Sequence, residues 1–292
     1  MKFANVVING RRELSIKLDT GFLPLSRLTD LLPIPTGDIS SIVSSNLDIP
    51  AVQEILDDNN KKFDNLIIQT NRIDSYLPCI ENPGKIICIG LNYKKHAAEE
   101  GSAIPNEPIV FGKFSNSLAG HLEAIPIPPE SRQVDYEGEL GIVIGKKSFN
   151  VSTERALDYV FGYFIANDVS ARDLQFKSSQ WLLGKSCDKF APIGPWIVTT
   201  EEIPNPNRLQ IQTFVNKKIR QNSNTSDMIF SCDRLISYLS KFFTLLPGDI
   251  ILTGTPEGVI QGMPDRDRNW LKKDDVVEIT IERIGELRNK FY

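Results

Sequence analysis

The 292-residue sequence has few of the residues that usually bind transition metals. It contains only two histidines, His96 and His121, so a zinc site built from several histidines is excluded. Its four cysteines show no metal-type spacing, and we expect them to be reduced and mostly packed in the interior. They are Cys79, Cys88, Cys187 and Cys232. A bound metal should therefore have oxygen ligands, which favours Mg²⁺, Mn²⁺ or Ca²⁺.

Long hydrophobic runs and clusters of basic residues are also absent. No run of 18 apolar residues occurs, and residues 1–10 lack the features of a signal peptide. We therefore expect a cytoplasmic protein that does not bind membranes. The net charge is only −4 and the pI is about 5.4, which argues against nucleic acid as a partner, because phosphate binding requires clustered basic residues.

The length and composition allow one large domain or two ordinary ones. The contents of 41% hydrophobic and 24% charged residues are typical of a soluble globular protein. Motifs with residue types that commonly take part in catalysis or metal binding become much more frequent after the Pro-Gly turn near residue 83. We therefore predict a small N-terminal domain over residues 1–78 and a catalytic domain over residues 79–292.

The N-terminal region predicts a hairpin and a helix. Residues 3–8 and 13–18 alternate apolar and polar side chains, and the Asn9-Gly10 pair between them favours a tight hairpin turn. Residues 51–62 carry apolar side chains at helical spacing, and Lys61-Lys62 suits the C-terminal end of a helix.

The stretch over residues 134–145 carries the strongest chemical signal. Side chains alternate along a strand, so Glu137 and Glu139 project from the same face. If that face is buried, two carboxylates cannot both stay ionised without a cation, and a divalent metal is the natural partner. Taken alone, the pattern also fits a strand with a solvated acidic face. Residues 161–168 predict another strand, in which Asp168 shares a face with apolar side chains and is a third candidate ligand.

A short polar helix is predicted over residues 94–101. On this helix His96 and Glu99 are three residues apart and lie on one face. A carboxylate beside an imidazole fixes its tautomer and raises its basicity, which suits a general base. The same pair is also common on exposed helices. Because the helix has no apolar stripe, it is a candidate for a mobile lid.

Five further polar residues lie near the ends of predicted strands or in the segments that follow them. They are Lys113, Arg172, Gln175, Lys185 and Thr255. Arg172 and Gln175 are three residues apart in a helix expected after Asp168, so they should share a face. Taken singly, each of the five has an ordinary explanation as a surface or turn residue.

Together, five ordered blocks resemble the fumarylacetoacetate hydrolase superfamily. They are Gly90-Leu91-Asn92-Tyr93 with His96 and Glu99, residues 135–140, residues 167–175, Gly184-Lys185-Ser186 and Gly254-Thr255-Pro256. The resemblance runs from about residue 85 to the C-terminus. It implies an α+β, mainly β fold with a rolled mixed sheet and a small N-terminal α/β domain. It also implies a divalent metal on Glu137, Glu139 and Asp168, and usually a homodimer.

The resemblance also implies a class of reaction, the cleavage of a carbon–carbon bond in a small 3-oxo-substituted 2-oxo acid. Mg²⁺ or Mn²⁺ would stabilise the enolate that forms. The residues that would contact the substrate oxygens are Lys113, Arg172, Gln175 and Thr255. The residues that would be catalytic are His96, Glu99 and Lys185.

The leaving group decides the reaction. The branch that is most similar decarboxylates oxaloacetate, which needs no nucleophile, and we expect this reaction. Acylpyruvate hydrolysis, in which His96 would activate a water, and isomerisation or decarboxylation of an unsaturated dioate are alternatives. A carboxylate sensor that binds metal without turnover is the non-enzymatic alternative, but mere binding needs no base.

Overall fold

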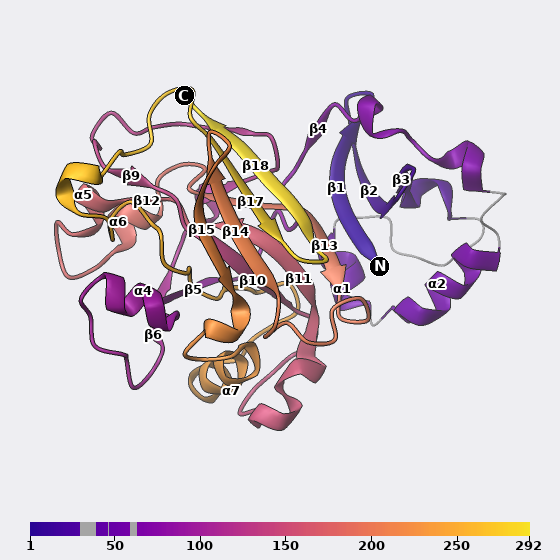
Figure 1. The fold of residues 1–292 in the computed structure, drawn as a ribbon. Helices are drawn as coiled ribbons and strands as arrows, with labels where there is room; N and C mark the ends of the chain where they lie inside the picture. The colour runs from indigo at the N-terminus through magenta and orange to yellow at the C-terminus, as the bar shows by residue number, and fades with distance from the viewer. Residues whose placement is uncertain (30–38, 46, 59–62) are drawn as a thin grey trace.

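The computed structural model describes residues 1–29, 39–45, 47–58 and 63–292, and its framework is a large mixed sheet (Figure 1). The strands of this sheet are β1 (Lys2–Ile8), β2 (Arg11–Leu18), β3 (Gly21–Pro24), β5 (Ile86–Gly90), β6 (Ile109–Gly112), β10 (Gly138–Ile144), β11 (Val160–Asn167), β13 (Ala191–Thr199) and β16 (Ile250–Leu252), with β4 (Ser75–Tyr76) and β7 (Leu118–Ala119) at its margins. They are ordered β3-β2-β1-β13-β11-β10-β16-β5-β6. Strand β10 therefore lies near the middle of the sheet.

A second sheet lies in front of the first in Figure 1. Its strands are β8 (Ala124–Ile125), β14 (Gln210–Val215), β15 (Lys218–Asn224), β17 (Val276–Ile281) and β18 (Gly285–Phe291). They are ordered β15-β14-β17-β18-β8, and a separate short pair joins β9 (Val134–Asp135) to β12 (Ser170–Ala171). The sheets pack closely at Gly138, where a Cβ atom would lie 2.3 Å from the Thr213 hydroxyl oxygen. The α+β, mainly β fold expected from the sequence is confirmed.

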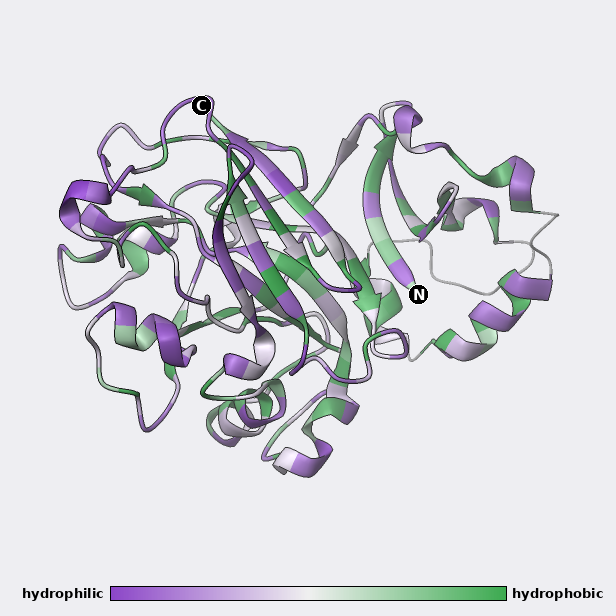
Figure 2. Cartoon of the chain, in the orientation of Figure 1, coloured by the Kyte–Doolittle hydropathy of each residue, from purple (hydrophilic) through white to green (hydrophobic). Residues whose placement is uncertain are grey.

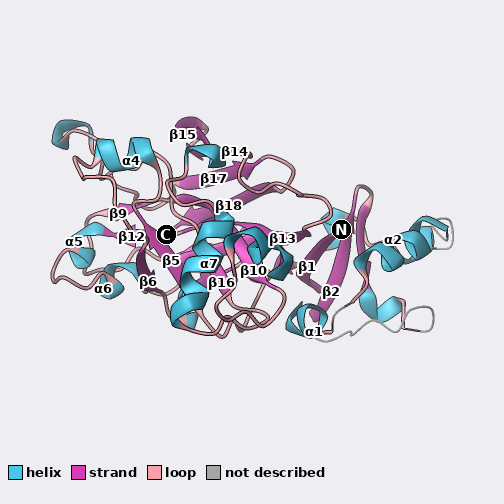
Figure 3. Cartoon of the chain, turned by 90° about the horizontal axis from the view of Figure 1, so that it is seen from below, coloured by secondary structure: helices cyan, strands magenta, loops and turns pink. Residues whose placement is uncertain are grey.

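The helices are short and surround the strands (Figure 3). They are α1 (Ile39–Ser44), α2 (Ile49–Asp58), α4 (Lys94–Glu99), α5 (Arg172–Gln175), α6 (Leu182–Lys185) and α7 (Cys232–Phe242), with 3₁₀ turns at Leu25–Arg27, Asp64–Leu66, Thr70–Arg72, Ser115–Ser117, Thr153–Tyr159, Thr225–Asp227 and Asp265–Asp267. Helices α1 and α2 lie at one end of the molecule, and α4, α5 and α6 at the other. Among the described residues, no helix combines the length and the apolar character needed to cross a bilayer.

The predicted N-terminal hairpin is confirmed. Strands β1 and β2 pair antiparallel, and Asn9 and Gly10 have φ values of 50° and 71°, as a tight primed turn requires. Strand β1 also pairs with β13, so the hairpin extends the main sheet. The predicted helix corresponds to α2, and its expected end at Lys61-Lys62 lies outside the described residues. The domain boundary at residue 78 stays a prediction.

Burial of β10 explains how the fold carries two glutamates into its interior. All seven residues of β10 are buried between β11 and β16. Figure 2 shows hydrophobic residues along the central strands. Buried apolar side chains pack on both faces of these strands. Gly141 leaves room for the Phe164 ring, which a Cβ atom would approach to 2.3 Å. The apolar run after Glu139 thus supplies the burial that makes its charge costly.

Candidate metal and active site

Three carboxylates meet where β10 begins and β11 ends. The two strands are antiparallel with Gly138 opposite Asn167, so Glu137, Glu139 and Asp168 come to one end of the pair. One oxygen from each lies within 4.8 Å of the others. The side chains are buried, at 6%, 1% and 0% relative exposure. The solvated acidic face considered from the sequence is therefore wrong.

Two buried lysines compensate part of this charge. Lys113 Nζ lies 2.5 Å from Asp168 Oδ1, and Lys185 Nζ lies 2.7 Å from Glu137 Oε2 and 2.9 Å from Asp168 Oδ2. Burial opposes ionisation of Glu137, but the charges of Lys185 and Arg172 outweigh it and lower the pKa of this carboxyl. Burial likewise opposes the charge on Lys185, but Asp168 and Glu137 raise the pKa of its ammonium.

Glu139 differs from the other two carboxylates. It accepts a hydrogen bond from the Gly254 N–H at 2.8 Å, and it forms no ion pair with any of the described residues. Burial and the charges of Asp168 and Glu137 raise the pKa of Glu139 well above its usual range. A divalent cation among the three oxygens would remove this penalty, so the donor set fits an oxygen-preferring ion such as Mg²⁺ or Mn²⁺.

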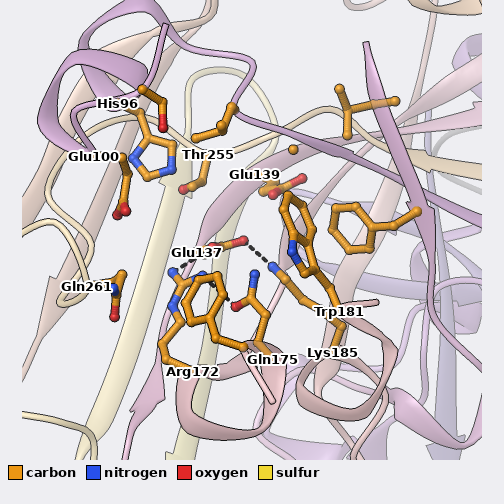
Figure 4. Close-up of a pocket in the computed structure, with 16 residues that line it drawn as sticks. His96, Glu100, Glu137, Glu139, Arg172, Gln175, Trp181, Lys185, Thr255 and Gln261 are labelled. Atoms are coloured by element: carbon orange, nitrogen blue, oxygen red, sulfur yellow. Dashed lines mark hydrogen bonds and ion pairs between the residues drawn. The ribbon is translucent and has the colours of Figure 1, made fainter. Parts of the chain in front are cut away.

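Most of the predicted site residues surround one cavity of about 170 Å³ (Figure 4). Those that line it are His96, Glu137, Glu139, Arg172, Gln175, Lys185 and Thr255. Lys113, predicted to contact substrate, does not line this cavity. Its ammonium instead contacts Asp168 and the carbonyl oxygen of Val169. The position of Lys113 therefore suits support of the triad better than substrate contact.

The guanidinium of Arg172 is largely occupied by protein groups. Its Nε and Nη2 atoms donate to Asp135 Oδ2 at 3.0 and 2.9 Å, and Nη2 also lies 2.7 Å from Glu137 Oε1. Its Nη1 donates to Gln175 Oε1 at 3.0 Å. Arg172 therefore holds Glu137 and Gln175 in place, and few of its donors are free for a substrate.

The predicted histidine and glutamate pair forms on α4. His96 Nδ1 lies 3.4 Å from Glu99 Oε2, and the histidine is only 5% exposed. Each carboxylate oxygen of Glu99 accepts from the Gly258 N–H at 3.1 Å. Ala97 and the preceding Tyr93 are fully buried. The helix is thus better anchored than its sequence suggests, and His96 is not on an exposed surface.

Residues 85–292 match the family model described as "Fumarylacetoacetate (FAA) hydrolase C-terminal", which is more than half of the chain. The chain belongs to the fumarylacetoacetate hydrolase family. It is therefore an enzyme of this family, and a sensor without turnover is not favoured.

Two curated relatives are similar to this fumarylacetoacetate hydrolase family member. A "Fumarylacetoacetate hydrolase domain-containing protein 2 homolog" from Dictyostelium discoideum is 49% identical over 247 residues, which cover 78% of this chain and 80% of the relative. "Oxaloacetate tautomerase fahd2, mitochondrial" from Xenopus laevis is 49% identical over 217 residues, which cover 74% of this chain and 67% of the relative.

Solved structures of the family have the same fold. The fumarylacetoacetate hydrolase from Exiguobacterium antarcticum has a TM-score of 0.82 at 30% identity and covers 100% of this chain and 99% of its own. A 2-hydroxyhepta-2,4-diene-1,7-dioate isomerase from Mycobacterium marinum has a TM-score of 0.76 at 30% identity, with coverage of 100% and 98%. Family members thus share this fold while their described reactions differ.

Several residues of this family member's site were missed by reasoning from the sequence. Asp135 accepts from Arg172 and from the N–H groups of Ile260 and Gln261. Asp135, Glu137 and Glu139 alternate along the chain, and this spacing could have indicated that Asp135 lies on the same face as the two glutamates. Other missed residues line the cavity, namely Phe111, Trp181, Gln261 and Glu100. For these, no local pattern in the sequence indicates that they face a site.

Proposed function

We propose that this enzyme interconverts the keto and enol forms of oxaloacetate, or of a closely similar small 2-oxo acid. The observation that carries the proposal is the placement of a buried acidic triad and a histidine around one cavity. Its volume of about 170 Å³ suits a small substrate, since pockets for drug-sized ligands measure roughly 300–1,000 Å³. The relatives from Xenopus laevis and Rattus norvegicus, described as oxaloacetate tautomerases, support this choice.

The C1 carboxylate and the C2 oxygen of the substrate, which we call the head group, would bind at the triad. A divalent ion held by Glu137, Glu139 and Asp168 supplies Lewis-acid stabilisation of negative charge on the substrate oxygens. Lys185 uses two of its three N–H donors on Glu137 and Asp168, and the residue lines the cavity. The third donor would bind the C1 carboxylate or the C2 oxygen of the substrate.

His96 would move the proton. In the keto form it takes a proton from C3, the C–H electron pair forms the C2=C3 double bond, and the carbonyl pair moves to the C2 oxygen. The His96 imidazolium then returns its proton to that oxygen, directly or through a water molecule, which gives the enol and regenerates the neutral histidine. Glu99, 3.4 Å from Nδ1, would stabilise the imidazolium while it holds the proton.

Oxaloacetate decarboxylation, the reaction that the sequence favours, is the alternative. Decarboxylation passes through the enolate of pyruvate and tautomerisation through the enolate of oxaloacetate, and loss of CO₂ needs no base. A buried histidine at the cavity therefore favours proton transfer. Acylpyruvate hydrolysis and dioate isomerisation would use the same histidine. Because the similar structure from Mycobacterium marinum is described as a dioate isomerase, dioate isomerisation should be assayed as well.

The test uses the full chain with Mn²⁺ or Mg²⁺, and a chelator for the metal-free arm. Ultraviolet absorbance of the enol follows tautomerisation, and pyruvate release follows decarboxylation. Acetylpyruvate and an unsaturated dioate are assayed in parallel. We expect chelator-sensitive tautomerisation of oxaloacetate to be the fastest reaction. Enolisation no faster than in buffer alone would overturn the proposal.

The variant His96→Gln should lose about 10²–10⁴-fold in tautomerisation, because a positioned base is removed. Its thermal stabilisation by Mn²⁺ should remain, since the triad is intact. His121→Asn is the matched control, because the second histidine does not line the cavity. Any decarboxylation should be less sensitive to His96→Gln. Full tautomerisation by this variant would show that His96 is not the base.

We also propose that the enzyme is a homodimer. Exposed apolar side chains occur on β6, α5 and α6 or just after them, and these three elements also contribute residues to the lining of the cavity. The exposed side chains are Val110, Phe114, Phe176, Leu182 and Leu183, and we call them the apolar patch. A second copy that covers this patch would remove apolar surface from water. The cytoplasmic location and the lack of membrane or nucleic-acid partners stay predictions from the sequence.

A further inference from the structure

Glu100 is a carboxyl group at the cavity that the proposed mechanism does not use. It follows α4 directly, and its N–H donates to the His96 carbonyl oxygen at 3.0 Å. Its side chain lines the cavity beside His96 (Figure 4). Its Oε1 atom is shut off from solvent and has no hydrogen-bond partner among the described residues. A buried polar atom without a partner is costly, so a ligand that pairs with it gains affinity.

Charged groups from several elements face Glu100. His96 and Glu99 belong to α4, Arg172 to α5, and Glu137 to the segment before β10. Burial raises the pKa of Glu100, the charges of Arg172 and His96 oppose this, and those of Glu137 and Glu99 reinforce it. The carboxyl therefore holds its proton more readily than an exposed glutamate and can donate it in a hydrogen bond.

Glu100 lies on the side of the cavity where the distal end of the substrate would bind. In Figure 4 it lies on the side of the cavity away from Lys185 and Trp181, and Gln261 lines the cavity on the same side. A substrate whose C1 and C2 oxygens bind at the triad would extend its distal end toward this side. The distal group of a small 2-oxo acid is a carboxylate or a ketone, and both accept hydrogen bonds.

We propose that Glu100 is a specificity-determining residue that donates a hydrogen bond to the distal oxygen of the substrate. It would favour ligands with a distal acceptor over ligands that carry only the head group. The inference rests on the proposed function for the location of the head group at the triad. It does not depend on which reaction follows.

The test measures binding, so that it is independent of turnover. Oxalate carries only the head group, and malate adds a distal carboxylate but cannot enolise. Dissociation constants for both are measured by calorimetry with the Mn²⁺-loaded full chain. The variants are Glu100→Ala, Glu100→Gln and, as matched control, Glu286→Ala on β18, whose side chain is exposed and outside the cavity.

We expect Glu100→Ala to weaken malate binding about 10-fold or more, the effect of a lost hydrogen bond to a charged group. Oxalate binding should change less than about 2-fold, which also shows that the variant is folded. Glu100→Gln should restore most of the malate affinity, because its amide still donates. Equal losses for both ligands, or no loss for malate, would overturn the inference.

The outcome separates this inference from the proposed reaction. If malate selectivity depends on Glu100 but oxaloacetate is not tautomerised, the specificity role holds and the reaction is wrong. If tautomerisation occurs but Glu100→Ala binds malate normally, the specificity role is wrong and the reaction holds.

Discussion

Replacing Glu139 by glutamine should separate two effects of its negative charge. Glutamine has nearly the same shape and can still accept the hydrogen bond that Gly254 donates at 2.8 Å. The substitution therefore tests the charge with little change in packing. Burial and the charges of Asp168 and Glu137 raise the pKa of Glu139, so in the metal-free protein stability is lost as the pH rises above the unfolded value of the carboxyl. Glu139→Gln should abolish that loss and stabilise the metal-free protein at neutral pH.

The same variant should lose the ion. A metal at 100 times its dissociation constant stabilises the folded state by about 2.7 kcal/mol. In a chain of 292 residues that corresponds to a rise in Tm of about 4–5 °C. The structure offers three carboxylate ligands, and Glu139→Gln removes the charge of one of them. We expect the Mn²⁺-induced rise in Tm to fall below about 2 °C, and activity to be lost with it.

The assay is thermal unfolding with chelator and with Mn²⁺ at pH 5 and pH 7.5. Wild type, Glu139→Gln and the exposed control Glu286→Gln are compared. The expected pattern is a higher metal-free Tm and a lost metal response in Glu139→Gln alone. A variant with an unchanged metal response would remove Glu139 from the ion site. A lower metal-free Tm would show that the buried charge is stabilised by something other than the ion.

Two further predictions concern a histidine and the apolar patch. Burial and the charge of Arg288 lower the pKa of His121 from 6.5 to about 4, so the unfolded chain binds more protons between these values and stability falls as the pH falls. From pH 7 to pH 5 wild type should lose about 2 kcal/mol more stability than His121→Asn in denaturant titrations, because the variant lacks this group. The same pH dependence in both proteins would refute the prediction. Leu183 in the apolar patch is 64% exposed, and Leu183→Asp should give monomers in light scattering. The control is Phe242→Asp on α7, which should leave the dimer intact. Dimers in both variants would place the interface elsewhere.

Local periodicity was enough to predict part of the site. Glu137 and Glu139 share a face because strand geometry repeats every two residues, and the His96–Glu99 pair follows from helical spacing in the same way. The contact with Asp168 depends on the register of β10 against β11, in which Gly138 lies opposite Asn167. No local pattern specifies such a register, so this contact was expected only as a candidate from strand patterns and through the family resemblance.

Other features could not be predicted because they depend on distant segments. Strand β1 extends the main sheet by pairing with β13, almost 200 residues later, and β13 itself was not predicted. Helix α4 lacks an apolar stripe, yet the bond from Gly258 to Glu99 anchors it.

The charges around the triad explain why the site suits an anionic substrate. Four buried carboxylates, those of Asp135, Glu137, Glu139 and Asp168, are balanced by three cations, those of Lys113, Lys185 and Arg172. With all groups ionised the cluster carries one excess negative charge, which is consistent with the raised pKa of Glu139. A divalent ion changes the excess to one positive charge in a buried environment, where charge is costly. The C1 carboxylate of a 2-oxo acid would then balance this one positive charge, so the ion and the substrate would stabilise each other at the same three carboxylates.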